Sequence, residues 1–352
     1  MYPIVEIKLN QIIENAKAMK KICEKNNKIY CLITKVLSDN KEVVKAITDN
    51  GITCIGESRI ENLISYKDIK VEKWLIRIPM ICEVEDVIKY SDVSLNSELV
   101  TLKALNEAAI KQNKIHKVIL MYELGDLREG CSKQELEEVI KESLKLSNIK
   151  IYGLGANLSC YGATIPTKEN MKELVDVAEE LERKFNIKFE LISGGNSSSY
   201  KMLKNGELPD RVNNLRLGES VFLGNVPCFE EPILEFNRNN FILKTQIIEL
   251  KEKTSVPRGK HYVDSFGHIP TFIDRGIRKK AIIALGKQDV RLDCLIPQDN
   301  DIIVLGGSSD HVILDVTDCK QEYKVGDEVS FKLNYGGLLN IMTSKYVERK
   351  II

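Results

Sequence analysis

The sequence has no long hydrophobic run and no cluster of like charges. None of its 352 residues lies in a stretch that approaches the ~18 consecutive apolar residues of a membrane-spanning helix. The beginning, MYPIVEIKLNQ, has no basic region followed by an apolar segment, so we expect no signal peptide. The 51 basic residues are balanced by 51 acidic ones, and no basic block indicates a nucleic-acid surface. These features predict neither a membrane partner nor a nucleic-acid partner.

Cysteine and histidine occur in patterns that favour neither disulfides nor a metal. The nine cysteines are an odd number, widely scattered, and no two form a CxxC pair. This usage is typical of reduced thiols, and it predicts a cytoplasmic protein. Only four histidines occur, none at metal-ligand spacing. We therefore expect no metal site.

The first two thirds of the chain alternate between short apolar runs and amphipathic helical stretches. At 170–185 apolar side chains recur at i, i+3, i+4 and i+7, and Ser132 with Glu135 forms a capping box before another helix. Strands that alternate with helices are typical of parallel βα units, and eight of them predict a closed (β/α)8 barrel, similar to a TIM barrel. We assign this barrel to residues 1–234, with a helix near 12–26 lying against it. The predicted strands are 29–35, 52–58, 73–79, 92–97, 117–123, 149–157, 189–195 and 213–218.

The last part of the chain, residues 235–352, has a different pattern. Short β-type runs are separated by Gly, Pro, Asp and Asn, and no long amphipathic helix interrupts them. We therefore expect a second, mostly antiparallel β domain. Its predicted strands are 241–251, 279–286, 292–297, 301–307, 311–316 and 327–333.

Lys35 ends the first predicted barrel strand, in YCLITK. In the plain interpretation it marks the strand's end and reaches into solvent. In a barrel, however, functional residues collect at the carboxyl ends of the strands. A lysine held there in a partly apolar site is less stable as an ammonium, which makes its amine nucleophilic.

The loops after the seventh and eighth strands carry groups suited to a phosphate. SGGNSSS at 193–199 combines two glycines, which allow close approach of the backbone, with hydroxyl and amide donors. Strand alternation directs Arg216 into the barrel mouth, and Gly218 follows it. Each feature alone also fits a flexible polar loop or a salt bridge at the rim. Opposite a lysine amine, the two together predict pyridoxal 5'-phosphate, whose aldehyde requires an amine and whose phosphate requires fixed donors.

Several motifs together resemble the alanine racemase family of pyridoxal-phosphate enzymes, across essentially the whole chain. They are LITKVLSD, GLGANLSCYG, SGGNSSS, NLRLGESVFLG, FIDRGIRKKAIIALGKQDV, GGSSDHVILDV, GDEVSF and LNYGGLL. Within the family the chain looks most like the ornithine racemase branch. The resemblance implies an isomerase that interconverts L- and D-ornithine by proton transfer at Cα.

The resemblance also implies roles for the residues of the barrel mouth. Lys35 would link to the cofactor's aldehyde and serve as one catalytic base. The phosphate would be held by Ser197 and by the backbone of Gly218 and Glu219, with Asn196 beside them.

Further cofactor contacts follow from the same resemblance. Tyr335 would bind the phosphate, and Arg128 would lie near the cofactor's phenolic oxygen and the substrate carboxylate. Asn157 stands where alanine racemases usually have a histidine against the ring. Arg216 would face the pyridine nitrogen; a guanidinium keeps its proton, so it cannot protonate that nitrogen. This points toward racemisation and away from decarboxylation.

A racemase needs a second base for the other face of the substrate. In alanine racemases this base is a tyrosine from the partner subunit's β domain, but here the matching position is Phe266. Tyr262 and His268 are the nearest candidates, and an imidazole exchanges protons near neutral pH. Other candidates are Ser308, Asp310 and His311. The resemblance implies a homodimer with shared active sites.

Other interpretations stay open. The substrate is an amino acid, with ornithine first and lysine or arginine next; alanine racemase is the nearest rival, but the chain lacks that enzyme's KANAYGHG pattern around the lysine. A non-catalytic pyridoxal-phosphate-binding protein would be expected to stop after the barrel. A D-amino-acid aldolase or dehydratase would require a metal ligand set that the second domain does not supply.

Overall fold

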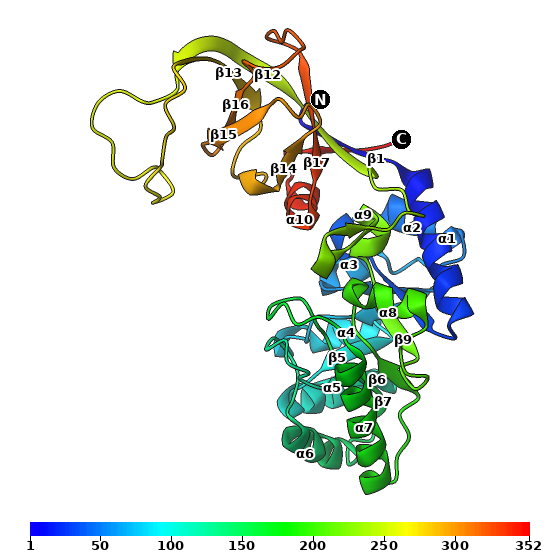
Figure 1. Ribbon diagram of the computed structural model, residues 1–352. Coiled ribbons are helices and arrows are strands. Elements are labelled where there is room, and N and C mark those ends of the chain that lie inside the picture. Colours follow the sequence, from blue (N-terminus) through cyan, green and yellow to red (C-terminus); the bar gives the residue numbers. More distant parts are fainter. The chain divides into compact units, whose positions relative to one another are not determined.

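The computed structural model describes residues 1–352, which divide into two compact units (Figure 1). One unit comprises residues 10–238, and the other comprises residues 1–9 and 239–352. The predicted domains, 1–234 and 235–352, differ from this division at the N-terminus. Strand β1 (Ile4–Ile7) pairs antiparallel with β12 (Phe241–Thr254) and parallel with β18 (Glu348–Ile351), so it belongs to the second unit.

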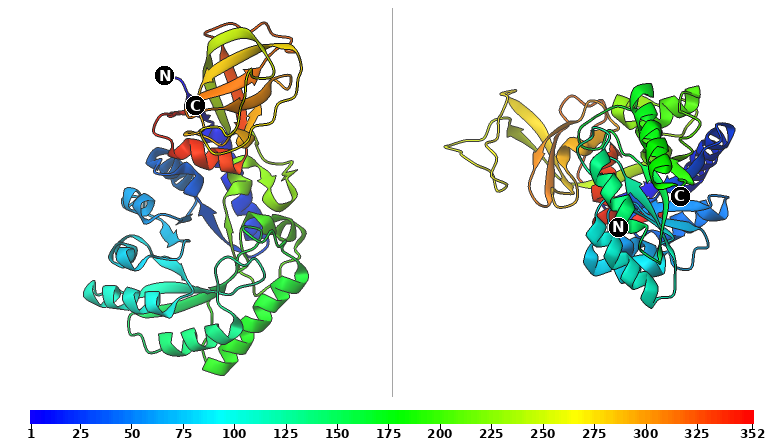
Figure 2. Two further views of the ribbon diagram at one scale, coloured as in Figure 1. Left: turned by 90° about the vertical axis from the view of Figure 1, so that its left-hand side faces the viewer. Right: turned by 90° about the horizontal axis from the view of Figure 1, so that it is seen from below.

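The unit of residues 10–238 is a closed barrel of eight parallel strands, which confirms the predicted fold. The views in Figure 2 show its helices outside the strands. The barrel strands are β2 (Ile29–Ile33), β3 (Cys54–Glu57), β4 (Glu72–Leu75), β5 (Val93–Asn96), β6 (His116–Met121), β7 (Ile149–Gly155), β8 (Leu191–Ser193) and β9 (Asn214–Leu217).

Most of the α-helices in this unit follow a barrel strand, whereas α1 precedes the first one. They are α1 (Leu9–Lys25), α2 (Lys41–Asp49), α3 (Ile60–Ser65), α4 (Val84–Tyr90), α5 (Leu99–Lys111), α6 (Lys133–Ser143), α7 (Lys168–Phe185), α8 (Tyr200–Asn205) and α9 (Glu219–Leu223). Short 3-10 helices are η1 (Lys35–Leu37), η2 (Ile81–Glu83), η3 (Ser197–Ser199) and η4 (Pro227–Phe229), and a small hairpin joins β10 (Asn225–Val226) to β11 (Glu231–Pro232).

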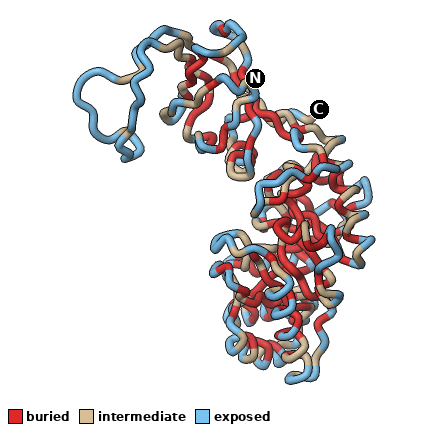
Figure 3. Tube along the Cα trace, viewed as in Figure 1, coloured by how far each residue is buried: buried red, intermediate tan, exposed pale blue.

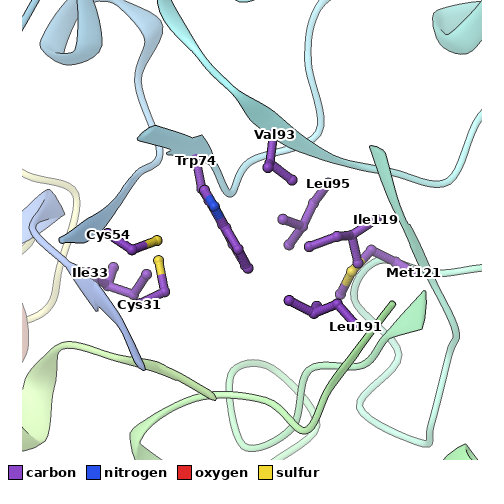
Figure 4. Packing of buried hydrophobic residues seen from close by; sticks show 9 residues of the cluster. All are labelled: Cys31, Ile33, Cys54, Trp74, Val93, Leu95, Ile119, Met121 and Leu191. Carbon is purple, nitrogen blue, oxygen red and sulfur yellow. The ribbon is translucent and has the colours of Figure 1, made fainter. Parts of the chain in front are cut away.

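The barrel interior is filled by apolar side chains, as the period-two alternation of strand residues requires. Figure 4 shows them pointing toward one another from strands around the barrel. They include the only tryptophan, Trp74, and two cysteines, Cys31 and Cys54, from neighbouring strands. Because the strands are also covered by helices, buried residues fill the centre of this unit (Figure 3).

Helix boundaries follow from local sequence signals. The predicted capping box of α6 is present: the Ser132 hydroxyl accepts from the Glu135 amide at 3.3 Å, and the Glu135 carboxylate accepts from the Ser132 amide at 2.7 Å. Helix α1 is tied to the barrel by Asn15, whose Nδ2 donates to the carbonyl of Val221 at 2.8 Å. The predicted apolar face of α7 is buried, with Met171, Leu174, Val175, Ala178 and Leu181.

The second unit is built on a mostly antiparallel sheet, as predicted. Its strands run in the order β14-β17-β12-β13-β16-β15, with β1 and β18 beside β12. The elements not yet given are β13 (Ile277–Ala284), η5 (Leu292–Cys294), β14 (Leu295–Pro297), β15 (Ile303–Gly307), β16 (His311–Asp315), β17 (Glu328–Leu333) and α10 (Tyr335–Thr343).

Two features of this unit bear on function. Helix α10 was not among the predicted elements, because its sequence YGGLLNIMT is short and lacks an amphipathic pattern; Asn334 caps it by accepting from the Gly337 amide at 2.9 Å. Residues 255–276 form a long connection between β12 and β13 that extends away from the sheet and is largely exposed (Figures 1 and 3). No helix of the protein is both long enough and apolar enough to cross a membrane.

Candidate active site

Lys35 lies at the carboxyl end of the first barrel strand, where the sequence predicts it. Ile33 ends β2 with its side chain in the barrel interior, and Lys35 opens η1 two residues later. Val36 and Leu37 are buried and anchor the turn, while Lys35 is half-buried. Lys35 thus lies at the barrel mouth, partly shielded from water, which the interpretation of a solvated strand end does not predict.

Arg216 points into the barrel, as the alternation along β9 predicts. It is paired in register with Cys31, an interior residue of β2, and its side chain is almost fully buried. The guanidinium donates to the Ser193 hydroxyl, to the carbonyl of Ala156 at 2.9 Å and to Asn157 Oδ1 at 3.3 Å. Burial lowers the pKa of Arg216, and the nearby charge of Glu129 opposes that effect. The result is a buried cation held by neutral oxygens.

Arg128, Glu129, Asn157 and Asn196 form one polar network. Arg128 and Glu129 form an ion pair, with Nη2 and Oε1 2.6 Å apart. Asn157 Nδ2 donates to Glu129 Oε1 at 3.0 Å, and Asn157 Oδ1 accepts from Asn196 Nδ2 at 3.1 Å. Burial opposes ionisation of Glu129, but Arg128, Asn157 and the charge of Arg216 prevail and lower its pKa. The network therefore contains two cations, Arg128 and Arg216, and one carboxylate, Glu129.

The serine-rich loop meets the start of α9 at a single hydroxyl. Ser197 Oγ accepts hydrogen bonds from the Gly218 amide, the Ser220 amide and the Ser220 hydroxyl, each at 3.1 Å. Asn196 caps η3 and accepts from the Ser198 amide at 2.9 Å. Backbone and hydroxyl donors thus converge on Ser197, where the sequence predicts a phosphate site. The second amide is that of Ser220, whereas the sequence pointed to the backbone of Glu219, whose phosphate contact stays a prediction.

The glycines of this region are required by close packing. A Cβ atom on Gly218 would lie 2.7 Å from the carbonyl oxygen of Ile33, at the end of β2. Gly195 adopts φ +96°, a conformation that favours glycine. Donors at the start of a helix, a close-packed glycine and a nearby amine are a set that fits the phosphate and aldehyde of pyridoxal 5'-phosphate. Lys35, Ser197, Gly218 and Arg216 are the residues that would hold it.

Glu57 was not predicted from the sequence, and Glu219 was predicted only through its backbone, but the carboxyl groups of both are affected by the charge of Lys35. Glu57 ends β3, and the Glu219 side chain extends from the first turn of α9. Burial raises the pKa of each to about 7, although hydrogen bonds and Lys35 oppose the shift. Glu57 could have been identified from the sequence, because it is an acidic residue at the end of a buried strand, in CIGES.

Other missed residues connect the predicted ones. Ser193 bridges Arg216 and Asn214, to whose Oδ1 it donates at 2.5 Å, and Glu129 bridges Arg128 and Asn157. Strand alternation would have directed Ser193 inward with Leu191. No local pattern marks Glu129, because its role depends on the loop after β7.

The remaining predicted residues lie in the second unit. Tyr335 is the first residue of α10, and Tyr262 and His268 are exposed in the 255–276 connection. Phe266 packs against the ammonium of Lys287, 4.0 Å from its ring centroid, and carries no titratable group. The phosphate contact of Tyr335 and the second base therefore stay predictions.

The turn around Phe266 is organised by Asp264. Its Oδ1 accepts from the Phe266 amide at 2.8 Å and from the His268 amide at 2.9 Å. These bonds, first of all the one from His268, lower the pKa of Asp264. The His268 ring lies beside the same carboxylate, with Nδ1 3.7 Å from Oδ1. The turn thus presents a histidine next to a fixed negative charge.

Comparisons with known proteins show the family of this chain. The family described as "Alanine racemase, N-terminal domain" matches residues 7–226. The chain is 49% identical over 353 residues to an ornithine racemase of Acetoanaerobium sticklandii, covering 100% of both proteins. It is 38% identical over 351 residues to a lysine racemase of Thermotoga maritima, covering 99% of this chain and 98% of that protein.

A solved structure shares the fold of this chain. The alanine racemase of Bartonella henselae, solved with covalently bound pyridoxal phosphate, superposes with a TM-score of 0.75 at 16% identity, covering 99% of each chain. At that identity the likeness shows the fold, whereas the family match and the two full-length relatives show descent. The chain belongs to the alanine racemase family.

Proposed function

We propose that this protein is a pyridoxal 5'-phosphate-dependent racemase that interconverts L- and D-ornithine. The observation that carries the proposal is the barrel mouth, where Lys35, the donors around Ser197 and the buried Arg216 meet. The full-length likeness to an ornithine racemase supports the substrate, and the pyridoxal phosphate of the Bartonella henselae enzyme supports the cofactor.

The residues of the mouth divide the work of binding. The Ser197 hydroxyl would hold the phosphate together with the amides of Gly218 and Ser220, which donate to Ser197 Oγ in this structure. The amine of Lys35 would hold the aldehyde carbon. When bound, the cofactor withdraws electrons and so makes the substrate's Cα proton easier to remove. Arg128 would pair with the substrate carboxylate while Glu129 keeps its guanidinium in place.

Arg216 supports racemisation because its guanidinium cannot give up a proton to the cofactor. Its guanidinium stays protonated, and its hydrogen bonds to Ser193, Ala156 and Asn157 fix its position. A donor that keeps its own proton would leave the pyridine nitrogen of the cofactor unprotonated. This would limit how far negative charge spreads from Cα into the ring. Rapid return of a proton to Cα is then favoured over the side reactions that need a more delocalised charge.

Proton exchange on two faces calls for two bases. Lys35 removes or returns the proton on one face, and we assign the other face to Tyr262 or His268 of a partner subunit. The 255–276 connection supports contact with a second subunit because it exposes several large apolar side chains, among them Val263, Ile269 and Ile273. Exposed apolar side chains that lie together often mark a protein–protein contact. We accordingly propose a homodimer with shared sites.

Lysine is the second candidate substrate, because a lysine racemase is also similar over nearly the full length. Both side chains end in an ammonium, so the proposal is for a basic amino acid with ornithine first. We also propose a cytoplasmic location; all nine cysteines are free thiols, which suits a reducing compartment.

The direct test is a substrate panel with isotope uptake. We expect purified protein with pyridoxal phosphate to abolish the optical rotation of L-ornithine and to introduce deuterium at Cα in heavy water, with slower turnover of lysine and little of alanine. Borohydride reduction should fix the cofactor on Lys35, as located by peptide mass spectrometry. Label on another lysine, or exchange without loss of chirality, would contradict the proposal. If lysine is turned over faster than ornithine, lysine becomes the proposed substrate.

A further inference from the structure

Glu57 is a buried carboxyl at the barrel mouth that the proposed mechanism does not use. It ends β3 and is fully buried. Its carboxylate accepts from the Thr34 hydroxyl at 2.7 Å, from Asn62 Nδ2 at 3.1 Å and from the Ser58 amide at 3.2 Å. All three donors are neutral. A buried carboxylate held only by neutral groups is costly, so its position calls for an explanation.

The position of Glu57 is tied to that of Lys35 through Thr34. The Thr34 amide donates to the carbonyl of Gly56 at 2.9 Å, and the Thr34 hydroxyl donates to Glu57. The peptide that leads into Lys35 is therefore fixed to the end of β3 by two bonds. The positive charge of Lys35 also acts on Glu57 and opposes the rise in its pKa that burial causes.

The ionisation of Glu57 responds to its surroundings near neutral pH. Burial raises the pKa of Glu57 to about 7, while the bonds from Thr34, Asn62 and Ser58 and the charge of Lys35 lower it. A carboxyl balanced near neutrality changes charge when a neighbouring amine gains or loses a proton. A carboxyl in water, with an ordinary pKa, would stay ionised throughout.

We propose that Glu57 is a positioning residue for Lys35: its carboxylate orients the lysine turn through Thr34, and its charge and that of the lysine's amine act on each other. The inference rests on the proposed function only for the use made of that amine, which is to return a proton to Cα. Two other titratable groups act electrostatically with Lys35: Glu219 on α9, whose carboxyl bonds to Asn225, and the thiol of Cys160 in the loop after β7. Glu57 differs from both because it is bonded to the residue next to Lys35.

The test measures Lys35 directly in the full chain without cofactor. The rate at which Lys35 is acylated by a small anhydride is followed against pH by peptide mass spectrometry, because only the neutral amine reacts. We expect the midpoint of this profile to fall by about one pH unit in Glu57→Gln, since the negative neighbour is lost while the size of the side chain is kept. Glu61→Gln, which changes an exposed carboxylate on α3, is the matched control and should leave the midpoint in place.

A second pair of variants keeps the test decisive if Glu57→Gln does not fold. Thr34→Val removes the hydroxyl that stabilises the charged carboxylate, so the Lys35 midpoint should fall by a smaller amount, whereas Thr34→Ser keeps a hydroxyl and should not move it. If Glu57→Gln folds and its Lys35 acylation midpoint is unchanged, the proposal is overturned. If only Thr34→Val folds, an unchanged midpoint in that variant overturns it.

The coupling must also appear from the other side. Infrared difference spectra between the wild type and Glu57→Gln isolate the carbonyl band of the protonated Glu57 carboxyl. We expect its midpoint to rise above about 7 in Lys35→Met, which has no charge, and to stay near or below it in Lys35→Arg. Equal midpoints in these two variants would refute the coupling. Neither readout needs racemisation, so a failure of the proposed function would leave this result standing, and the reverse also holds.

Discussion

Arg216 is the residue whose surroundings are least expected for a charged side chain. A buried guanidinium normally pairs with a carboxylate, because an unpaired buried charge loses its hydration without compensation. Here the direct partners are Ser193, Ala156 and Asn157, and Glu129 acts from one residue further away through Asn157. The guanidinium is thus held in place without being neutralised, which leaves its charge directed at whatever occupies the barrel mouth.

Glu57 makes the stability of the barrel depend on pH. Its pKa is about 7 in the folded protein against an ordinary value of 4.5, so between these values the folded state holds a proton that the unfolded chain has released. The free energy of unfolding therefore falls as the pH rises through this window, by about 3 kcal/mol for this group. Glu219 acts in the same direction, and His116, whose burial lowers its pKa to about 4, acts in the opposite direction.

The contribution of Glu57 can be isolated by comparison with Glu57→Gln. Urea unfolding followed through Trp74, the only tryptophan and a residue of the barrel interior, reports this unit. We expect the wild type to lose about 3 kcal/mol relative to the variant between about pH 4.5 and about pH 7.5. A difference that stays constant with pH would show that Glu57 titrates normally.

At the scale of elements, the predicted phosphate cradle, made of Ser197, Gly218 and Ser220, forms where η3 contacts the start of α9. The residues come from two different loops, 21 positions apart in sequence between Ser197 and Gly218. A serine loop and a glycine after a strand predicted the two halves separately. Which hydroxyl meets which amide follows from the closure of β8 against β9, so Ser220 could not be identified beforehand.

Ser197→Ala tests the cradle against a neighbouring serine. We expect the dissociation constant of pyridoxal phosphate to rise about 10- to 100-fold, because a hydroxyl bound to a charged phosphate contributes roughly 1.5–3 kcal/mol. Ser199→Ala is the matched control: its hydroxyl donates to the carbonyl of Gly194 at 2.8 Å and is not directed at the donors beside Ser197. Fluorescence titration of the cofactor into each variant measures the difference. Equal losses in both variants would mean that loop stability, not the phosphate contact, was affected.

At the scale of the whole molecule, the proposal of shared sites depends on pairing two copies. Closed two-fold symmetry would give each site one lysine from one subunit and one 255–276 connection from the other. A Lys35→Ala protein and a Tyr262→Phe/His268→Gln protein should each be inactive, but hybrid dimers would contain one complete site. After subunit exchange, an equal mixture should recover about a quarter of the wild-type activity.

Light scattering provides the control for this experiment, since exchange requires a dimer. A monomer at assay concentration, or an exchanged mixture without recovered activity, would contradict shared sites. The single variants identify the second base. If Tyr262→Phe is inactive alone and regains activity when mixed with Lys35→Ala, while His268→Gln is fully active, the second base is Tyr262. The converse would assign it to His268, beside Asp264.

The sequence by itself determined the features that depend on local pattern. Alternation of apolar runs with amphipathic helices predicted the closed barrel, and period two along β9 predicted that Arg216 points inward. Lys35 was predicted at a strand end because a charge after a buried run is a local signal. The same reasoning did not predict β1 as a strand and assigned its residues to the barrel, because a strand of four residues contains no local signal for its partner strands.

Only the tertiary structure decided which side chains meet. Strand β1 joined the second unit because its partners, β12 and β18, lie in the last third of the chain. Glu57 and Thr34 are 23 residues apart, and Glu129 and Asn157 are 28 residues apart. Closing the barrel brings the ends of its strands to one rim, so contacts between distant residues there are set by the packing of the whole unit, which no short stretch of sequence records.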